Sequence, residues 1–364
     1  MATATISLAA LQHNLHLVRG HLQAPTRVLA AVKSDAYGHG APAVARQLVA
    51  CGVDWLGVAT RAEALELRAS GIGANILIFS PLYDGLQELL DADVALPVVD
   101  AASLEAVERA ARQAGITARV HLKVDTGMGR LGELPKDAAR LAETAHKSTH
   151  VELEGLWTHF SCADESPRDF TLQQIERFCE TITLLERHGI QVPLKHAANS
   201  PGLLAYPEAH FDMVRPGIAL YGYHSTDLTL ELEPGFRPIL TLSAPITFVK
   251  RVAPGRPVSY GATWRAQQET TLATVRIGYA DGYPRNLANR GKVRLHGELR
   301  PIAGKVCMDQ LMVDAGDLDV RVGDRAVLFG PEGPTAEEVG RLAGTISYEM
   351  LTSLGKRVER EYLA

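Results

Sequence analysis

The chain of 364 residues has little of what marks fibrous, secreted or membrane proteins. Its 4 cysteines include no CxxC pair, which excludes a disulfide scaffold and favours a reducing, cytoplasmic location. No apolar run approaches the ~18 residues that a transmembrane helix needs. The N-terminus lacks a basic start before an apolar run, so we predict no secretory signal. With 32 glycines and 19 prolines, the composition also excludes a low-complexity chain.

The sequence also lacks a stripe of charges of one sign. Lysine and arginine number 37 against 42 acidic residues, for a net charge of −5. No basic stripe is present, so we expect neither nucleic acid nor an anionic membrane as a partner. The histidines are scattered without ligand spacing, and we therefore predict no metal site.

Short β-branched runs alternate with helical stretches through residues 1–235. Ile175, Phe178, Ile182 and Leu185 repeat at helical spacing before Gly189, which marks a helix stop. Such alternation predicts right-handed βαβ units, and eight of them fit a (β/α)8 barrel. A doubly wound open sheet is the rival fold, but no Gly-x-Gly-x-x-Gly follows the first strand. The expected strands are Thr26–Lys33, Trp55–Ala59, Asn75–Ser80, Ala95–Val99, Ala118–Asp125, Val151–Phe160, Pro193–Ser200 and Met213–Gly222.

The pattern changes in residues 236–364, where short strand-like runs are separated by glycine, proline and aspartate. This pattern predicts a second, mostly β domain, a small barrel or sandwich. The chain is therefore predicted to be an α/β protein, an N-terminal TIM-like barrel followed by this domain. The expected elements are strands at Thr241–Val252, Thr271–Ile277, Lys292–His296, Ile302–Val306, Leu311–Asp314 and Ala326–Phe329, and short helices at Ala336–Gly344 and Tyr348–Leu354.

Chemistry in such a barrel is expected at the C-terminal ends of the strands. Lys33 follows a buried apolar strand, where burial lowers the pKa of an amine and makes it a nucleophile and a base. The alternative is a lysine whose stem is buried while its amine reaches water. Other polar residues at expected strand ends are Lys123, Arg130, His159, Asn199, Ser200 and Arg215.

The sequence resembles the alanine racemase family, a resemblance that covers nearly the whole chain. It rests on nine segments in order, spread over both predicted domains. They are Ala31–Gly40, His121–Gly132, Thr158–Phe160, His196–Ser200, Val214–Ile218, Val258–Gly261, Gly278–Arg285, Val306–Gln310 and Ser347–Glu349.

The resemblance implies an isomerase that interconverts L-alanine and D-alanine with pyridoxal 5′-phosphate as cofactor. It implies a homodimer with shared active sites, serving D-alanine supply for peptidoglycan or alanine catabolism. Three alternatives remain open: a racemase of broader specificity, a decarboxylase on the same architecture, and a non-catalytic pyridoxal-phosphate-binding protein. Arg215 and Tyr260 disfavour the decarboxylase, and the β domain disfavours the non-catalytic protein.

The same resemblance assigns catalytic roles. Lys33 would form a Schiff base with the cofactor and then act as the base on one face of the substrate Cα. Tyr260, reaching the active site of the other subunit, would act on the opposite face, with His159 and Arg215 as its cationic relay. Racemisation on the cofactor imine would then use two bases.

The remaining predicted contacts also follow from the resemblance. Tyr37, Ser200, Gly217, Ile218 and Tyr348 would hold the cofactor phosphate, and Arg215 would face the pyridine nitrogen. The cofactor phenolic oxygen and the substrate carboxylate would be bound by Arg130, and the carboxylate also by the main-chain N–H of Met308. Lys123 matches a lysine that is N-carboxylated in many members. Tyr279, Arg285 and Asp309 would shape the entrance, whereas His121 and His196 are expected as core or strand-end histidines.

Overall fold

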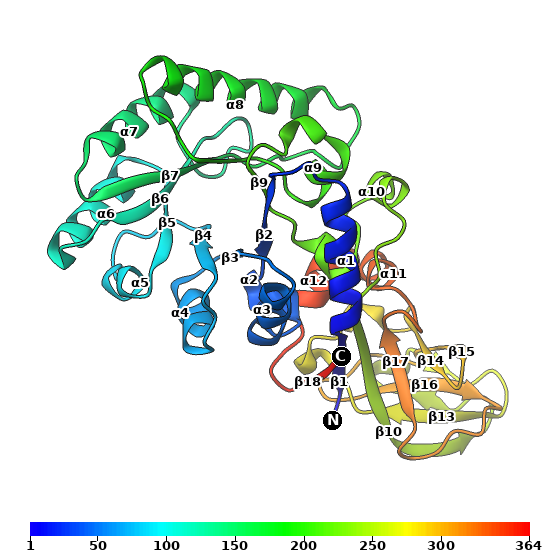
Figure 1. The fold of residues 1–364 in the computed structure, drawn as a ribbon. Coiled ribbons are helices and arrows are strands. Elements are labelled where there is room, and N and C mark those ends of the chain that lie inside the picture. The colour runs from blue at the N-terminus through cyan, green and yellow to red at the C-terminus, as the bar shows by residue number, and fades with distance from the viewer.

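The computed structural model of the chain describes residues 1–364, which form a barrel and a separate β-rich part (Figure 1). Eight parallel strands make the barrel, which confirms the fold class predicted from the sequence. Their order is β8-β7-β6-β5-β4-β3-β2-β9. The strands are β2 (Arg27–Ala31), β3 (Trp55–Val58), β4 (Asn75–Ile78), β5 (Val94–Val98), β6 (Ala118–Lys123), β7 (Val151–Trp157), β8 (Leu194–His196) and β9 (Met213–Val214).

The ring is nearly closed. No ladder joins β8 to β9, but backbone bonds bridge the two segments: Asp212 N–H donates to Lys195 O and Arg215 N–H to Ala198 O. The segment after β9 turns at Pro216, which has no N–H for a ladder, so β9 is much shorter than the expected strand 213–222. This turn carries Arg215 and Gly217 to the C-terminal end of the barrel.

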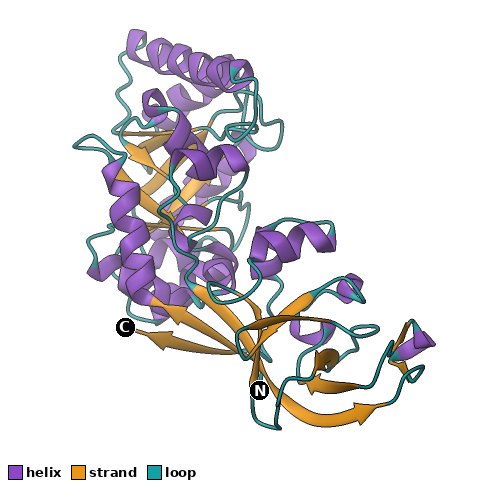
Figure 2. Ribbon diagram, turned by 90° about the vertical axis from the view of Figure 1, so that its right-hand side faces the viewer, coloured by secondary structure: helices purple, strands orange, loops and turns teal.

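Helices surround the barrel strands, and their ends follow local capping chemistry (Figure 2). Helix α4 (Arg61–Ala69) begins at Thr60, whose hydroxyl accepts from Glu63 N–H while the Glu63 carboxylate caps the Thr60 backbone. Helix α6 (Ala101–Ala114) ends at Gly115 with φ +69°. The others are α1 (Leu8–Gly20), α2 (Lys33–Gly38), α3 (Ala41–Ala50), α5 (Gln87–Asp91), α7 (Pro135–Lys147), α8 (Asp169–Arg187), α9 (Ser200–Ala205) and α10 (Asp227–Leu232).

A second eight-stranded sheet builds the β-rich part. Its main path is β15-β14-β17-β10-β1-β18, and β13 pairs with both β10 and β16. The N-terminal strand therefore joins this sheet and not the barrel, between β10 and β18. The bounds are β1 (Thr3–Ser7), β10 (Leu240–Val252), β13 (Thr270–Val275), β14 (Lys292–Leu295), β15 (Glu298–Pro301), β16 (Leu311–Gly316), β17 (Arg325–Phe329) and β18 (Glu359–Leu363), with the small ribbon β11 (Pro257–Val258) and β12 (Trp264–Arg265) and helices α11 (Ala336–Ala343) and α12 (Ser347–Thr352).

One expected strand, 302–306, is absent. Ile302 makes only an isolated bridge with Val313, and Gly304 then takes φ +84°, which turns the chain out of an extended path. The strand of this region is instead β15, four residues earlier.

The two parts share a hydrophobic core. A single cluster of 93 buried residues runs from the barrel helices into the second sheet. No helix is long and apolar enough to cross a bilayer. The shared core fixes the β-rich part against the barrel on the side where α2 packs against α12.

Candidate functional site

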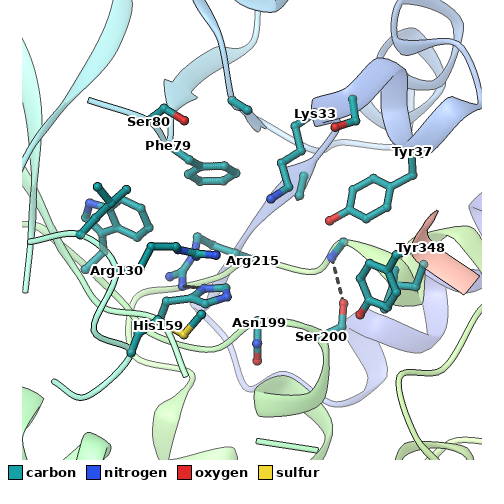
Figure 3. A pocket seen from close by; sticks show the side chains of 18 of the residues that line it. Lys33, Tyr37, Phe79, Ser80, Arg130, His159, Asn199, Ser200, Arg215 and Tyr348 are labelled. Atoms are coloured by element: carbon teal, nitrogen blue, oxygen red, sulfur yellow. Dashed lines mark hydrogen bonds between the residues drawn. The ribbon is translucent and has the colours of Figure 1, made fainter. Parts of the chain in front are cut away.

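A cavity of about 450 Å³ opens where the barrel strands end at their carboxyl side (Figure 3). Its walls come from segments that follow β2, β3, β4, β6, β7, β8 and β9, as barrel geometry predicts, and from Tyr348 and Thr352 of α12. The structure brings together ten of the residues predicted from the sequence: Lys33, Tyr37, Lys123, Arg130, His159, Ser200, Arg215, Gly217, Ile218 and Tyr348.

Five of the predicted site residues do not line this cavity. Tyr260 is 70% exposed and Met308 is 53% exposed, both on the β-rich part. Tyr279 is also exposed there, with Arg285 and Asp309. A single chain therefore holds Lys33 and Tyr260 in different places, and the predicted pairing of the two requires a second copy of the chain.

Lys33 begins a turn of unusual handedness. Ser34, Asp35, Ala36 and Tyr37 all have φ between +52° and +55°, so α2 is a left-handed helical turn. Such a conformation costs ~1–2 kcal/mol for each residue with a Cβ. Neighbouring groups hold it: Ser34 N–H donates to the Glu63 carboxylate at 2.6 Å, and the Asp35 carboxylate accepts from Ala41 N–H at 2.8 Å.

The Lys33 amine lies in an environment that disfavours its charge. Its Nζ stands 6.0 Å from the centre of the Phe79 ring, and Figure 3 shows the side chain extending into the cavity. Burial lowers the pKa of Lys33, and the positive charges of Arg130 and Arg215 lower it further, while Glu63 opposes them. A larger fraction of this lysine is therefore a neutral amine at pH 7 than for a lysine in water.

Arg215 is buried and held from several sides. Its Nη2 donates to the Thr158 and Ala197 carbonyls at 2.7 and 2.8 Å, and its Nη1 donates to His196 Nδ1 at 3.0 Å. His159 Nδ1 accepts from Nη2 at 3.4 Å. Burial lowers the pKa of Arg215 to about 9, which leaves the guanidinium charged at neutral pH.

Two further titratable groups sit beside this cation. Burial, followed by the charge of Arg215, lowers the pKa of His159 well below its ordinary value, so its ring is neutral at pH 7. Lys123 is 3% exposed, and burial together with Arg215 lowers its pKa to about 7. Its Nζ donates to the Val124 carbonyl at 3.0 Å and lies 4.9 Å from the Trp157 ring centre.

The opposite wall of the cavity carries the hydroxyl groups of Tyr37, Ser200 and Tyr348. Helix α9 starts at Ser200, whose Oγ accepts from Gly217 N–H at 2.9 Å and from Ala219 N–H at 3.3 Å. The Tyr37 and Tyr348 rings lie 6.0 Å apart, and Figure 3 shows both on the same side of the cavity as Ser200. A Cβ on residue 217 would collide with the Tyr37 hydroxyl, so glycine is required at the place where the chain approaches it.

Sequence reasoning missed several residues of the cavity wall. Phe79 and Ser80 directly follow β4, and Trp157 ends β7. Their positions at strand ends could have identified them, since apolar as well as polar residues at the C-terminal ends of barrel strands line the site. Met128 and Leu131 lie in the loop after β6, where no periodic pattern indicates which side chains point inward.

The fold and the site together define a class: enzymes built from a barrel and an attached β domain, with a partly buried lysine amine in a cavity at the carboxyl ends of the barrel strands. Residues 6–225 match the family described as alanine racemase, N-terminal domain. The alanine racemase C-terminal domain family matches residues 239–362. The chain belongs to the alanine racemase family, which confirms the enzyme class, an isomerase, expected from the sequence.

Individual relatives agree over the full length of the chain. The alanine racemase of Thermobifida fusca is 44% identical, covering 99% of this chain and 98% of the relative. The crystal structure of alanine racemase from D-cycloserine-producing Streptomyces lavendulae has a TM-score of 0.94 at 41% identity, covering 100% of this chain and 97% of that one. The alanine racemase of Bacillus anthracis, solved with bound L-Ala-P, has a TM-score of 0.90 at 33% identity, covering 100% and 95%.

Proposed function

We propose that this enzyme interconverts L-alanine and D-alanine in a homodimer with shared sites. Residues 1–235, joined by Tyr348 of the same chain, would bind pyridoxal 5′-phosphate, and residues 236–364 would lend Tyr260 and Met308 to the site of the partner. One observation carries the proposal: the Lys33 amine, the Arg215 cation and three hydroxyl groups share one cavity, while Tyr260 stands exposed outside it. All four cysteines are free, which supports a reducing, cytoplasmic location.

The residues present fit the cofactor. Tyr37, Ser200, Gly217, Ile218 and Tyr348 would hold its phosphate, because three hydroxyl groups gather there and the absence of a Cβ at residue 217 leaves room beside the Tyr37 hydroxyl. Arg215 would donate to the pyridine nitrogen, Arg130 to the phenolic oxygen, and the Lys33 amine would carry the aldehyde carbon. When bound, the cofactor acidifies the Cα–H of an attached amino acid by drawing electron density into its ring.

Lys33 would move the proton on one face of Cα. Its lowered pKa keeps a fraction of the amine neutral at pH 7, and a neutral amine accepts a proton. The nearby guanidinium groups that lower this pKa also make the protonated amine a better acid, so Nζ can return the proton in the reverse direction.

The opposite face of Cα would be served by Tyr260 of the partner subunit. Arg215 Nη2 lies 3.4 Å from His159 Nδ1, and because a guanidinium nitrogen cannot accept a hydrogen bond, this contact favours the tautomer in which His159 Nδ1 is the acceptor. The neutral His159 ring then carries its proton on Nε2. That N–H is free to donate to a phenolate, which would lower the pKa of the tyrosine and let it act as a base.

Arg130 and the main-chain N–H of Met308 from the partner subunit would bind the substrate carboxylate. We further propose that Lys123 is carboxylated and braces Arg130 as an anion. With a pKa of about 7, roughly half of the Lys123 amine is neutral at pH 7 and can add to CO2, forming a carbamate and releasing one proton. The carbamate would reverse the charge next to Arg215 from repulsive to attractive.

Complementation between two inactive variants tests the shared site. Lys33→Ala and Tyr260→Phe should each reduce racemisation, followed by circular dichroism, by about 10³-fold or more. Co-expressed together, random pairing should restore about one quarter of the wild-type rate, because half of the dimers would contain one intact site. Lys136→Ala, an exposed lysine on α7, is the control that should keep full activity. Absence of recovery in the mixture would contradict the proposal.

A further inference from the structure

A line of buried polar side chains leads from Arg215 away from the cavity and through the barrel core. Arg215 Nη1 lies 3.0 Å from His196 Nδ1, and His196 Nε2 lies 2.8 Å from His121 Nδ1. His121 Nε2 then lies 3.2 Å from the Glu154 carboxylate. Each ring thus uses one nitrogen toward the cavity and the other toward Glu154.

The two imidazoles have no access to solvent. His121 and His196 are both 0% exposed, and His196 stacks parallel to the Trp157 indole at 5.9 Å between centroids. Gly155 on β7 leaves the space for the His121 ring, since a Cβ there would collide with it. Burial lowers the pKa of both histidines, and Arg215 lowers that of His196 further, so both rings are neutral at pH 7.

Chemistry at the cavity end fixes the direction of these hydrogen bonds. A guanidinium has no acceptor, so His196 Nδ1 must accept from Arg215. A neutral imidazole has one proton, which therefore sits on His196 Nε2 and is donated to His121 Nδ1. The proton of His121 is left on Nε2, pointing at Glu154.

The Glu154 end of this hydrogen-bonded chain requires the same tautomers of His121 and His196. An ionised carboxylate only accepts, so it needs the His121 proton on Nε2. Burial raises the pKa of Glu154, but hydrogen bonds from His121 and Arg119 outweigh this and leave it below its ordinary value. The two ends of the chain, a donor-only cation and an acceptor-only anion, thus specify one set of tautomers.

We propose that Glu154 is a positioning residue for racemisation, which sets the tautomers of His121 and His196 and thereby holds Arg215 in its donating orientation. The inference rests on the proposed role of Arg215 toward the cofactor ring nitrogen. Glu154 does not line the cavity, and neither do its hydrogen-bond partners His121 and Arg119, so its effect on Arg215 passes through the two imidazoles.

Glu154→Gln is an informative variant because the two carboxylate oxygens of Glu154 have different nearest partners. Arg119 donates to Oε1 at 3.1 Å and also pairs with exposed Asp93 at 3.0 Å. In the glutamine variant Arg119 would keep the amide oxygen, and the amide NH2 would face His121. His121 would then carry its proton on Nδ1, His196 would follow, and two donors would oppose each other at Arg215.

Neutron diffraction of the deuterated holoenzyme tests the tautomers independently of turnover. The expected result is deuterium on Nε2 and none on Nδ1 of both His121 and His196. Deuterium on Nδ1 of either ring would overturn the proposal without bearing on whether the protein is a racemase. An inactive wild-type enzyme with the expected tautomers would instead contradict the proposed function alone.

Variant kinetics test the positioning role. Glu154→Gln should lower kcat by at least about tenfold, shift the visible absorbance of the bound cofactor, and leave KM for alanine nearly unchanged. Asp93→Asn, which alters the same arginine without touching an imidazole, should keep the wild-type kcat and spectrum. A folded Glu154→Gln enzyme with wild-type kcat and spectrum would overturn the proposal. A loss of kcat equal in both variants would overturn it too, since it would reflect Arg119 alone.

Discussion

At the scale of single residues, Arg215 is buried and held by four polar contacts. Its two terminal nitrogens reach two carbonyls and two imidazoles at once. A lysine has one nitrogen on a flexible stem and cannot reproduce this fork. The role of residue 215 therefore depends more on the planar geometry of the guanidinium than on its positive charge.

Arg215→Lys is predicted to lose at least about 10²-fold in kcat, because buried carbonyls at Thr158 and Ala197 lose donors at ~1–3 kcal/mol each and the cation shifts. Racemisation monitored by circular dichroism checks the rate. Arg325→Lys is the control, since that guanidinium is likewise hydrogen-bonded, with two contacts to Ser243, but lies in the β-rich part. Equal losses in both variants would show that the fork at Arg215 has no special role.

Lys123 gives a prediction of its own. Because its pKa of about 7 leaves much of the amine neutral, the purified enzyme should carry one added CO2 on this side chain. Native mass spectrometry in bicarbonate buffer should detect the adduct, and Lys123→Met should lack it. Acidification should remove it, since protonation of the nitrogen releases CO2. An unmodified mass in saturating bicarbonate would refute the modification.

At the scale of elements, α2 departs most from ordinary backbone rules. Ala36 is buried with φ +52°, a conformation that glycine adopts without penalty. Ala36→Gly should therefore be near neutral in free energy of unfolding, because relief of strain offsets the loss of a methyl group. Ala45→Gly, at an equally buried position in right-handed α3, should lower the free energy of unfolding by ~1–2 kcal/mol. Urea unfolding at one protomer concentration compares them, and equal destabilisation would argue against strain in α2.

The same element shows the limit of reading structure from sequence. Six residues, Lys33 to Gly38, follow an apolar strand, and the strand and the position of Lys33 at its end were predictable from the apolar run. The left-handed turn was not, because Ser34, Asp35 and Ala36 carry no glycine signal. Contacts from Glu63 on α4 and from Ala41 hold it, and such contacts are not visible in a local pattern.

For the site, the expectation that functional residues follow barrel strands predicted five residues after five different strands, and the structure places all of them around one cavity. They are Lys33, Lys123, His159, Ser200 and Arg215. Phenolic and backbone contributors such as Tyr348 came only with the family resemblance. Strand β1 was missed because its partners, β10 and β18, lie more than 230 residues away and its own five residues carry no turn signal.

At the scale of the whole molecule, buried neutral histidines make stability depend on pH. His39, His121 and His196 are fully buried, and burial lowers the pKa of His39 to about 4. The unfolded chain takes up these protons below about pH 6.5, whereas the folded chain does not, so stability falls as the pH drops. For His39 the loss between pH 7 and pH 5 is about 2 kcal/mol.

His39→Asn should reduce the stability difference between pH 7 and pH 5 by that amount, since asparagine does not titrate while its amide can replace the ring donor toward Ala36. Urea unfolding at both pH values gives the comparison. His146→Gln, at an exposed position of α7, should leave the difference unchanged. An unchanged pH dependence in His39→Asn would mean that this ring is charged in the folded protein.

The place of β1 between β10 and β18 also constrains how the protein can be assembled. Thr3 pairs with Ser243 on one side and with Glu359 on the other. During synthesis the first strand must wait for residues made some 350 positions later, whereas the barrel has all its strands once residue 214 has emerged. Cutting the gene between the two parts would leave the second fragment without the strand that attaches β18, so independent production of that fragment calls for grafting residues 3–7 onto it.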